Sequence, residues 1–566
     1  MMKQILFSML LAVGMPLMAE AQVEKQVEVT KDYVPTLERA EKLSIAPDMT
    51  DTMQLRPEID YTITPLSLQT TLATRPIRPA RMSYWEFNRP QPFYLKAGIG
   101  APLQSELDFY AATQNPSRGY LLGYLNHEGR YAPVENDFGA KHASERMLNR
   151  VGAAAGRRVG RRMLEGDVNY THRLYHRYGA HYAAEQLPSR IGYSDLDALI
   201  RIGDDFQNLT RTNFEVVADG SFLFDHTDPI ATAERGNQNC LGIASKVARA
   251  FGERRFQLGA VYRHAEGSQA LNRHRQQLLS ASFRYGSESA QYRYEVGADY
   301  YYDRFKGPFA CAENYLFPFA RLEFDLIGKA VKPFAEIDGS LRSNDFEHLS
   351  ALNPYLERPM WLGRSTAEWE VRGGLTGHSK QTRFNYRAYA AVALREHQLY
   401  WVIPTFSGDE PIRTAAGWLT PMQGRQTVVT LGGEMNYRPI TALQFDVAAR
   451  FYAYNDEEEI ENGLPNIEAE AAVRYEDRKV RIGLRALFEG AREWSVVDLS
   501  ADEPTLTAGS YKAPFAVDLR LNVEWLITAQ TALYVEGRNL LCRDLYRLPT
   551  LPEYGINGMI GVRIAF

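Results

Sequence analysis

Hydrophobic and polar residues alternate along most of the chain after residue 92. The final segment shows this pattern most clearly, with Tyr554, Ile556, Gly558, Ile560, Val562, Ile564 and Phe566 on one face and Asn557, Gly561 and Arg563 on the other. A period of two residues predicts a β-strand, because successive side chains of a strand point to opposite faces. We therefore predict a C-terminal strand with one apolar and one polar side.

The same alternation recurs inside the chain, and there the polar faces carry charged residues. Residues 213–224 set Phe214, Val216, Ala218, Gly220, Phe222 and Phe224 against Asn213, Glu215, Asp219 and Ser221. Residues 291–300 and 515–525 repeat this pattern. Charged side chains at every second position need water or polar protein beside them. We expect a wide aqueous lumen lined by Asp518, Arg520, Asn522, Glu524, Glu295 and Asp299.

About 22 such segments, within a range of about 18 to 22, follow one another between residues 93 and 566. Several links after even-numbered segments are short, as at 252–254, whereas several links after odd-numbered segments are long, as at 343–365 and 493–513. Transmembrane β-barrels alternate short periplasmic turns with long extracellular loops in this way. A soluble antiparallel sheet also alternates, but rarely through so many segments. The predicted fold class is all-β, a large antiparallel transmembrane barrel with both termini in the periplasm.

The N-terminal region predicts export from the cytoplasm. Residues 1–21 read as a signal peptide, with Lys3, an apolar run over residues 5–18 and the small-residue cleavage site Ala19-Glu20-Ala21. No later apolar stretch approaches the roughly 20 residues that a membrane helix needs. A membrane span must then be built from strands, and in lipid these must close into a barrel.

Residues 22–90 form a proline-rich segment ahead of the barrel, which we place at residues 91–566. Seven prolines interrupt any long helix or strand in this segment. Its basic cluster consists of Arg75, Arg78, Arg81 and Arg89. Three interpretations stay open: a cork that meets carboxylates in the lumen, a tether for a periplasmic or envelope partner, and a solvated linker.

The amino-acid composition of the chain favours a membrane barrel and argues against some other classes of protein. The chain has 33 Tyr, 26 Phe and 7 Trp, enough to supply the aromatic girdles that barrels place at both membrane interfaces. A net charge of −5 and the lack of a basic stripe argue against a nucleic-acid partner. Three cysteines are too few and too scattered for a disulfide framework.

Motifs for metal, cofactor or catalytic chemistry are weak. The acidic run at residues 456–459 lacks the alternating oxygen spacing of a calcium loop, and His172 and His176 are only weak metal candidates on one strand face. The chain contains neither G-x-S-x-G nor H-E-x-x-H. We expect no metal, no cofactor and no enzymatic activity.

The C-terminal region resembles the TonB-dependent receptors. In that family the penultimate strand runs into an Asn-Leu pair, then a Tyr, a proline-containing loop and a last strand ending in Phe; here these features are Arg538, Asn539, Leu540, Tyr546 and Phe566. The resemblance covers residues 93–566. It implies an outer-membrane location, contact with outer-membrane lipid, and recognition of the last strand by the barrel-assembly machinery. The family fills its barrel with an N-terminal plug, and residues 22–90 are too few for one, so we expect a barrel without a full plug.

This resemblance favours a barrel that moves a solute across the outer membrane. One alternative is a structural or assembly component that uses the N-terminal tail and the extracellular loops to hold an outer-membrane complex. Another is a porin-like passive channel. The sequence leaves these alternatives open because it does not show what closes the lumen.

Overall fold

The computed structural model describes residues 92–113, 119–135, 141–178, 188–228, 235–289, 291–307, 310–327, 330–356, 363–379, 383–405, 419–457, 460–461, 463–499 and 505–566. All of these residues belong to one compact unit, Ser83–Phe566. No helix in this part of the chain is long and apolar enough to cross a membrane.

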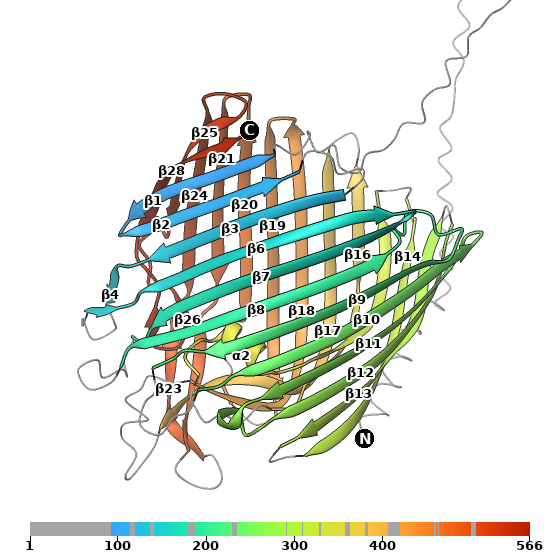
Figure 1. Cartoon of the computed structure of the whole chain (residues 1–566), viewed down its shortest axis with the longest axis horizontal. Coiled ribbons are helices and arrows are strands. Elements are labelled where there is room, and N and C mark those ends of the chain that lie inside the picture. Colours follow the sequence, from blue (N-terminus) through green and yellow to red (C-terminus); the bar gives the residue numbers. More distant parts are fainter. Residues whose placement is uncertain are drawn as a thin grey trace, which may run out of the picture. The chain divides into compact units, whose positions relative to one another are not determined.

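Twenty-two antiparallel strands form a closed barrel (Figure 1). The first strand closes it by pairing with the last, Tyr94–Ala101 against Gly558–Ala565. This confirms the predicted fold class and strand number. The barrel strands are β1 (Phe93–Ala101), β2 (Gln104–Ala112), β3 (Gly119–Arg130), β6 (Arg146–Val159), β7 (Arg162–His176), β8 (Arg190–Gly203), β9 (Asn213–Asp225), β10 (Gln238–Phe251), β11 (Arg254–Gly267), β12 (Arg275–Glu288), β13 (Tyr292–Lys306), β14 (Cys311–Phe324), β15 (Lys332–Arg342), β16 (Thr366–Ser379), β17 (Phe384–Thr405), β18 (Thr420–Ile440), β19 (Leu443–Asp456), β20 (Ile467–Glu476), β21 (Val480–Glu489), β24 (Ala516–Leu526), β25 (Thr531–Arg538) and β28 (Asn557–Ala565).

Many strands are longer than the 9 to 11 residues that cross a membrane at a tilt. β17 and β18 are the longest, with 22 and 21 residues. The extra length of β17 lies at its C-terminal end, where Ile403–Thr405 leave the barrel sheet and pair in parallel with Val496–Asp498. The additional residues therefore belong to structure built beyond the barrel wall.

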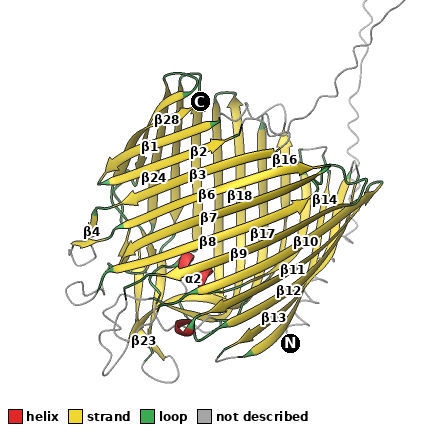
Figure 2. Ribbon diagram, viewed as in Figure 1, coloured by secondary structure: helices red, strands yellow, loops and turns green. Residues whose placement is uncertain are grey.

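The two ends of the barrel differ. One end carries short turns such as 160–161, 252–253 and 441–442, which we call the short-turn end. The opposite end, the long-loop end, holds further elements within its loops (Figure 2): β4 (Pro133–Glu135), β5 (Lys141–Ala143), η2 (Gln269–Leu271), α2 (Phe346–Leu352), β22 (Arg492–Asp498), β23 (Thr505–Ala513), β26 (Tyr546–Leu548) and β27 (Leu551–Pro552). The sequence predicted these segments only as links.

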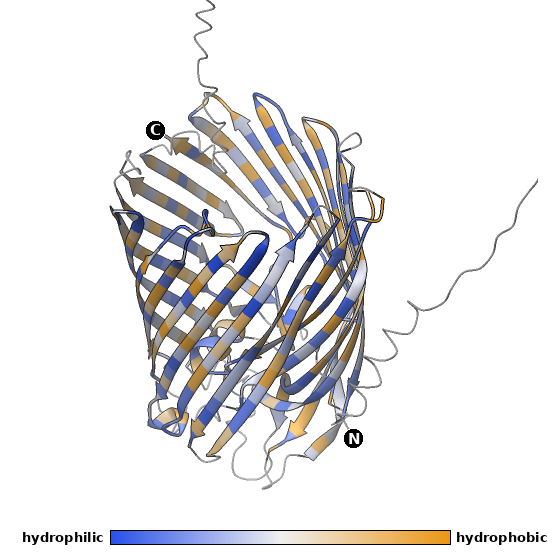
Figure 3. Cartoon of the chain, turned by 90° about the vertical axis from the view of Figure 1, so that its right-hand side faces the viewer, coloured by the Kyte–Doolittle hydropathy of each residue, from blue (hydrophilic) through white to orange (hydrophobic). Residues whose placement is uncertain are grey.

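Polar and apolar residues alternate as bands along the strands (Figure 3). The apolar set includes large exposed side chains, among them Ile200, Leu241, Leu258, Phe283 and Ile560. At the short-turn end, aromatic rings of neighbouring strands contact one another along this face: Phe384, Tyr386, Tyr437 and Phe445. A row of rings at the border of an apolar band is typical of the interface girdle of a membrane barrel.

The register of β24 gives a direct test of this face assignment. Leu519 and Asn522 lie on opposite faces of the strand, since they are three residues apart. We expect Leu519→Arg to lower the free energy of unfolding by about 2–4 kcal/mol in lipid, and Val562→Arg on β28 to have a similar effect. Asn522→Arg should be mild. Equal losses at Leu519 and Asn522, measured by denaturant unfolding in lipid vesicles, would contradict the assignment.

Candidate functional site

The charged face of β24 is held by ion pairs within the strand and with its neighbours. Asp518 contacts Arg520 at 2.6 Å, and Glu524 contacts Arg563 of β28 at 3.1 Å. The amide of Asn522 donates a hydrogen bond to Glu536 of β25 at 3.3 Å. Of the four residues predicted on this strand, Asp518 and Arg520 thus pair with each other, and Asn522 and Glu524 contact neighbouring strands.

The other two predicted residues lie on β13. Asp299 accepts hydrogen bonds of 2.8 and 2.6 Å from the guanidinium of Arg284 on β12. Glu295 lies opposite Arg321 of β14 in the strand register and shares its face of β13 with Asp299. Ion pairs explain how charged residues persist on this face; its assignment to the lumen stays a prediction.

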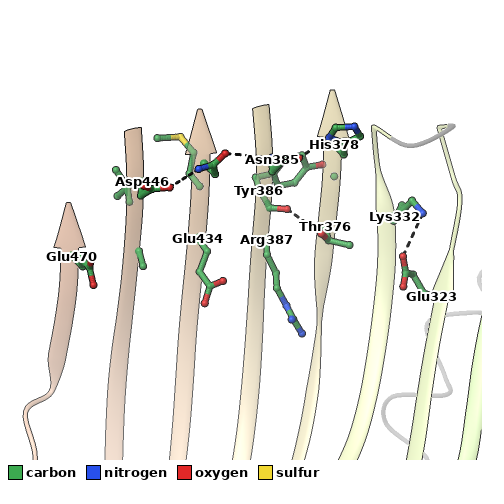
Figure 4. Close-up of a pocket in the computed structure, with 15 residues that line it drawn as sticks. Glu323, Lys332, Thr376, His378, Asn385, Tyr386, Arg387, Glu434, Asp446 and Glu470 are labelled. Atoms are coloured by element: carbon green, nitrogen blue, oxygen red, sulfur yellow. Dashed lines mark hydrogen bonds and ion pairs between the residues drawn. The ribbon is translucent and has the colours of Figure 1, made fainter. Parts of the chain in front are cut away.

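A cavity of about 520 Å³ lies against the same face of neighbouring strands, close to the short-turn end. Lys332 contacts Glu323 at 3.4 Å and Asp325 at 2.7 Å. Figure 4 shows Lys332 and Glu323 beside the side chains of the next strands, where a ring nitrogen of His378 lies 2.6 Å from the amide oxygen of Asn385. The residues that line this cavity and are labelled in Figure 4 are Glu323, Lys332, Thr376, His378, Asn385, Tyr386, Arg387, Glu434, Asp446 and Glu470. Both signs of charge and several amides are present, so the cavity suits a small polar molecule.

At the long-loop end, a segment between β15 and β16 folds against other parts of the barrel. We call residues 343–356 the cap. Its helix α2 begins after Asp345, whose side chain accepts a hydrogen bond from the backbone of His348 at 2.9 Å, as expected of a helix N-cap. The buried face of α2 is formed by Phe346 and Leu349.

The cap packs into an apolar cluster whose members come from distant parts of the barrel: Ile191, Tyr193, Leu223, Leu271, Phe346, Leu349, Tyr355, Leu356 and Leu551. These residues lie on β8, β9, η2, the cap and β27. Strands β8 and β9 are far around the circumference from β15 and from the loop between β25 and β28. Such segments meet only by reaching across the opening of the barrel, so the cap covers part of this end.

Buried hydrogen bonds fasten both ends of the segment that contains the cap. Gln276 of β12 accepts a bond from Ser343 at 2.5 Å and donates one to Ser365 at 2.9 Å. Its amide also donates to Asp303 of β13, whose carboxylate accepts a bond from Ser365. We call this group the latch: Gln276, Asp303, Ser343 and Ser365. A single glutamine thereby ties the start and the end of segment 343–365 to the barrel wall.

Two strands that precede β12 hold the start of α2. The side-chain oxygen of Gln238 on β10 accepts a hydrogen bond from the backbone N–H of Phe346 at 2.7 Å. Arg263 of β11 lies 3.2 Å from the carboxylate of Asp345. The first turn of α2 is therefore docked by polar contacts as well as by its apolar face.

His274 lies in the loop beside the latch, between η2 and β12. The residue is buried and its ring lies 5.5 Å from that of Phe305. Burial lowers the pKa of His274 to about 4, with Asp345 opposing the shift. Because the folded state resists protonation, its stability is full above pH ~6.5, the ordinary pKa of histidine, and is lost as pH falls toward 4.

Relative to His274→Gln, we expect the cap of the unmodified protein to open more readily at pH 5 than at pH 7.5, with His274 accounting for a loss of about 3 kcal/mol once the pH reaches 4. Hydrogen exchange at residues 343–356 measures this opening directly. His274→Gln is the control, because glutamine does not titrate in this range. Exchange in His274→Gln that changes with pH as much as in the unmodified protein would refute the role of His274.

The C-terminal motif has a structural role in the described part of the chain. Asn539, which is buried and has a φ of 48°, donates to the carbonyls of Arg543 and Tyr554 at 2.7 and 3.1 Å and accepts a bond from the N–H of Arg543 at 2.9 Å. The remaining motif residues contact strand or loop neighbours: Arg538 with Glu536, Leu540 with Leu519, Tyr546 with Tyr511, and Phe566 with Phe93. The motif fixes the last loop and the closing strand.

Other predicted sites are not brought together. A ring nitrogen of His172 lies 3.0 Å from Ser194, whereas His176 lies 3.4 Å from Glu145. Within the described ranges, no group of three or more His, Cys, Asp or Glu is placed to hold a metal ion. The cysteines Cys240, Cys311 and Cys542 are free. The basic cluster Arg75, Arg78, Arg81 and Arg89 and part of the 456–459 acidic run lie outside the described residues.

Comparison with solved structures places this geometry among known barrels. The Pseudomonas aeruginosa receptor FpvA, solved with bound pyoverdines, matches with a TM-score of 0.61 and 12% identity over 84% of this chain and 71% of that chain. The copper transporter OprC gives 0.62 and 12% over 85% and 81%, and the iron transporter FrpB from Neisseria meningitidis gives 0.64 and 11% over 85% and 82%. The chain has the barrel fold of the TonB-dependent receptors. These structural neighbours are transporters and a receptor rather than enzymes.

At 11–12% identity the likeness to TonB-dependent receptors establishes the fold alone. No protein-family model matches the sequence, and no curated protein does. The cap and the latch are the features of this barrel that sequence reasoning missed.

Proposed function

We propose that this barrel moves a solute across the outer membrane through its lumen and that the cap limits passage at the long-loop end. The observation that carries the proposal is the closed wall of 22 strands with its charged residues gathered on one face. Barrels of this size enclose a space wide enough for a channel, and large transporters occlude it with protein. Under this proposal, Asp518, Arg520, Glu524 and Asp299 line the lumen, and both termini lie in the periplasm.

The chemistry of the inner face favours a polar solute. The cavity near the short-turn end offers lysine, arginine, carboxylates and amides within one concave surface. FpvA, which has the same barrel fold, binds a pyoverdine–iron complex, and OprC and FrpB are a copper transporter and an iron transporter. We extend to this chain only the general role, transport of a polar solute.

Planar-bilayer conductance of the purified protein tests the proposal. The full chain should show small or rare currents, and a variant whose cap is released should show large, steady, ohmic ones. A version lacking residues 22–90 separates a contribution of that segment from that of the cap. If none of the three proteins conducts, and heat-modifiable gel mobility shows that all are folded, the transport proposal is wrong. That result would favour a structural role in an envelope complex.

A further inference from the structure

Three polar side chains meet on the apolar, outer face of the barrel at the long-loop end. Ser105 of β2, His127 of β3 and Asn149 of β6 come from three successive barrel strands. The Oγ of Ser105 lies 2.7 Å from Nε2 of His127, and Nδ1 of the same ring lies 2.6 Å from Oδ1 of Asn149. A hydroxyl, an imidazole and an orienting amide are thus aligned in the order of a nucleophile, its base and the group that holds the base.

The partner of each ring nitrogen defines the proton positions. The amide oxygen of Asn149 only accepts hydrogen bonds, so Nδ1 of His127 carries the proton. Nε2 is then the acceptor and faces the hydroxyl of Ser105. This tautomer is the one in which histidine acts as a general base toward a serine.

A fourth side chain completes the group. The hydroxyl of Tyr131 lies 3.2 Å from Oγ of Ser105 and 3.4 Å from Nε2 of His127. Gly129 makes room for it, because a Cβ at this position would lie 2.1 Å from the Tyr131 hydroxyl. Tyr131 therefore supplies a hydrogen-bond donor within reach of an oxygen that develops negative charge next to Ser105.

The position of this group points to its substrate. Ser105 is on the opposite face of β2 from Glu106, which pairs with Lys96, and its cross-strand neighbour Ile99 is 72% exposed. Leu125 and Val151, two residues further along β3 and β6, are exposed and apolar. Two residues of strand correspond to about 6.6 Å. The group lies at the border of the lipid-facing band, the depth at which membrane lipids carry their ester bonds.

We propose that Ser105, His127 and Asn149 form a hydrolytic centre for the acyl esters of membrane lipids. The Oγ of Ser105 attacks the ester carbonyl while His127 takes its proton; the ester C–O bond breaks and the lipid alcohol leaves with that proton. Water, deprotonated by His127, then attacks the acyl-serine and releases the fatty acid, restoring the serine. Asn149 orients the ring throughout. This activity belongs to the outer face and is independent of transport through the lumen.

A second serine–histidine pair on the same face provides a matched control. Ser194 of β8 lies 3.0 Å from His172, but the contact uses Nδ1, and Tyr170 also bonds to this serine at 2.9 Å. Ser194 is 2% exposed, whereas Ser105 is only partly buried. Ser194→Ala therefore removes a comparable hydroxyl without touching the proposed centre.

Two measurements on the full chain in detergent test the proposal. A fluorophosphonate probe, followed by peptide mass mapping, should modify Ser105. The second measurement is the release of free fatty acid from mixed micelles of glycerophospholipid and, separately, of lipopolysaccharide. Comparison of the two shows which lipid supplies the ester. Ser105→Ala and His127→Ala should lower release by about 1,000-fold or more, Asn149→Ala by less, and Ser194→Ala should leave it unchanged.

Heat-modifiable gel mobility shows which variants retain the barrel, and only folded variants are compared. Release from either lipid that depends on Ser105 supports the proposal. Absence of an adduct at Ser105, release from neither lipid, or equal release by Ser105→Ala and the unmodified protein would overturn it. A conductance that is unchanged in Ser105→Ala is expected in every case, because the lumen lies on the other face.

Discussion

Phe346→Ala is expected to release the cap and to raise the conductance of the barrel severalfold. Phe346 is completely buried and its ring packs edge-on against Tyr193 at 6.0 Å. Truncation of a buried phenylalanine to alanine costs about 3–5 kcal/mol. The loss acts on the cap rather than on the barrel, because the 22-strand hydrogen-bond ladder does not include α2.

Single-channel recording measures the conductance, and hydrogen exchange at residues 343–356 measures the stability of the cap. Leu352→Ala is the matched control, because Leu352 lies on the same helix with half of its surface exposed. An unchanged current despite faster exchange in Phe346→Ala would show that the cap does not obstruct the path. An unchanged exchange rate would show that the cluster does not hold it.

Gln276→Ala is expected to detach both ends of segment 343–365 at once. Its side chain contacts Ser343, Ser365 and Asp303, and alanine removes these hydrogen bonds while the bond from Ser365 to Asp303 stays. Each such hydrogen bond contributes about 0.5–1.5 kcal/mol, so the loss should be about 2–4 kcal/mol. Limited proteolysis within 343–365 should become faster by about one and a half to three orders of magnitude, since each 1.4 kcal/mol corresponds to about tenfold.

The adjacent Gln277→Ala provides the control for this variant. Gln277 points to the opposite face of β12, where its amide lies 3.5 Å from Tyr262. It should leave the proteolysis rate of the cap unchanged. If Gln276→Ala and Gln277→Ala behaved alike, the latch would have no particular role in holding the segment.

The barrel could be predicted because each strand is specified by the alternation of apolar and polar residues within its own segment of the sequence. Alternation over residues 515–525 assigns Leu519 and Asn522 to opposite faces, and the same rule applied along the chain gives the strand number. The ends of the strands were less predictable. β17 continues to Thr405 because its last residues, Ile403–Thr405, pair with β22. The pattern of residues within β17 does not indicate this pairing.

The cap was not predicted, since its contacts join residues far apart in sequence. Ser343 meets Gln276 at a separation of 67 residues, and Tyr193 bonds to the carbonyl of Pro354 at a separation of 161. A local signal was present: Asp345 precedes apolar residues at 346, 349 and 352, the spacing of a short amphipathic helix. It indicates the helix but does not show where the helix docks. Ser105, His127 and Asn149 were missed for the same reason, since their alignment depends on the register of three strands.

The pairing of β1 with β28 has a consequence for biogenesis. The two strands that close the wall are the first and the last of the barrel, so no closed ring exists until β28 has been synthesised. Before that point, the two edge strands of the incomplete sheet have unpaired backbone amides and carbonyls, which can pair with strands of other chains. Loss of β28 alone would leave β25 and β1 as unpaired edge strands. In lipid, no water is present to form hydrogen bonds with their free backbone amides and carbonyls. A nonsense mutation that removes β28 should therefore be as damaging to assembly as one that removes half of the wall.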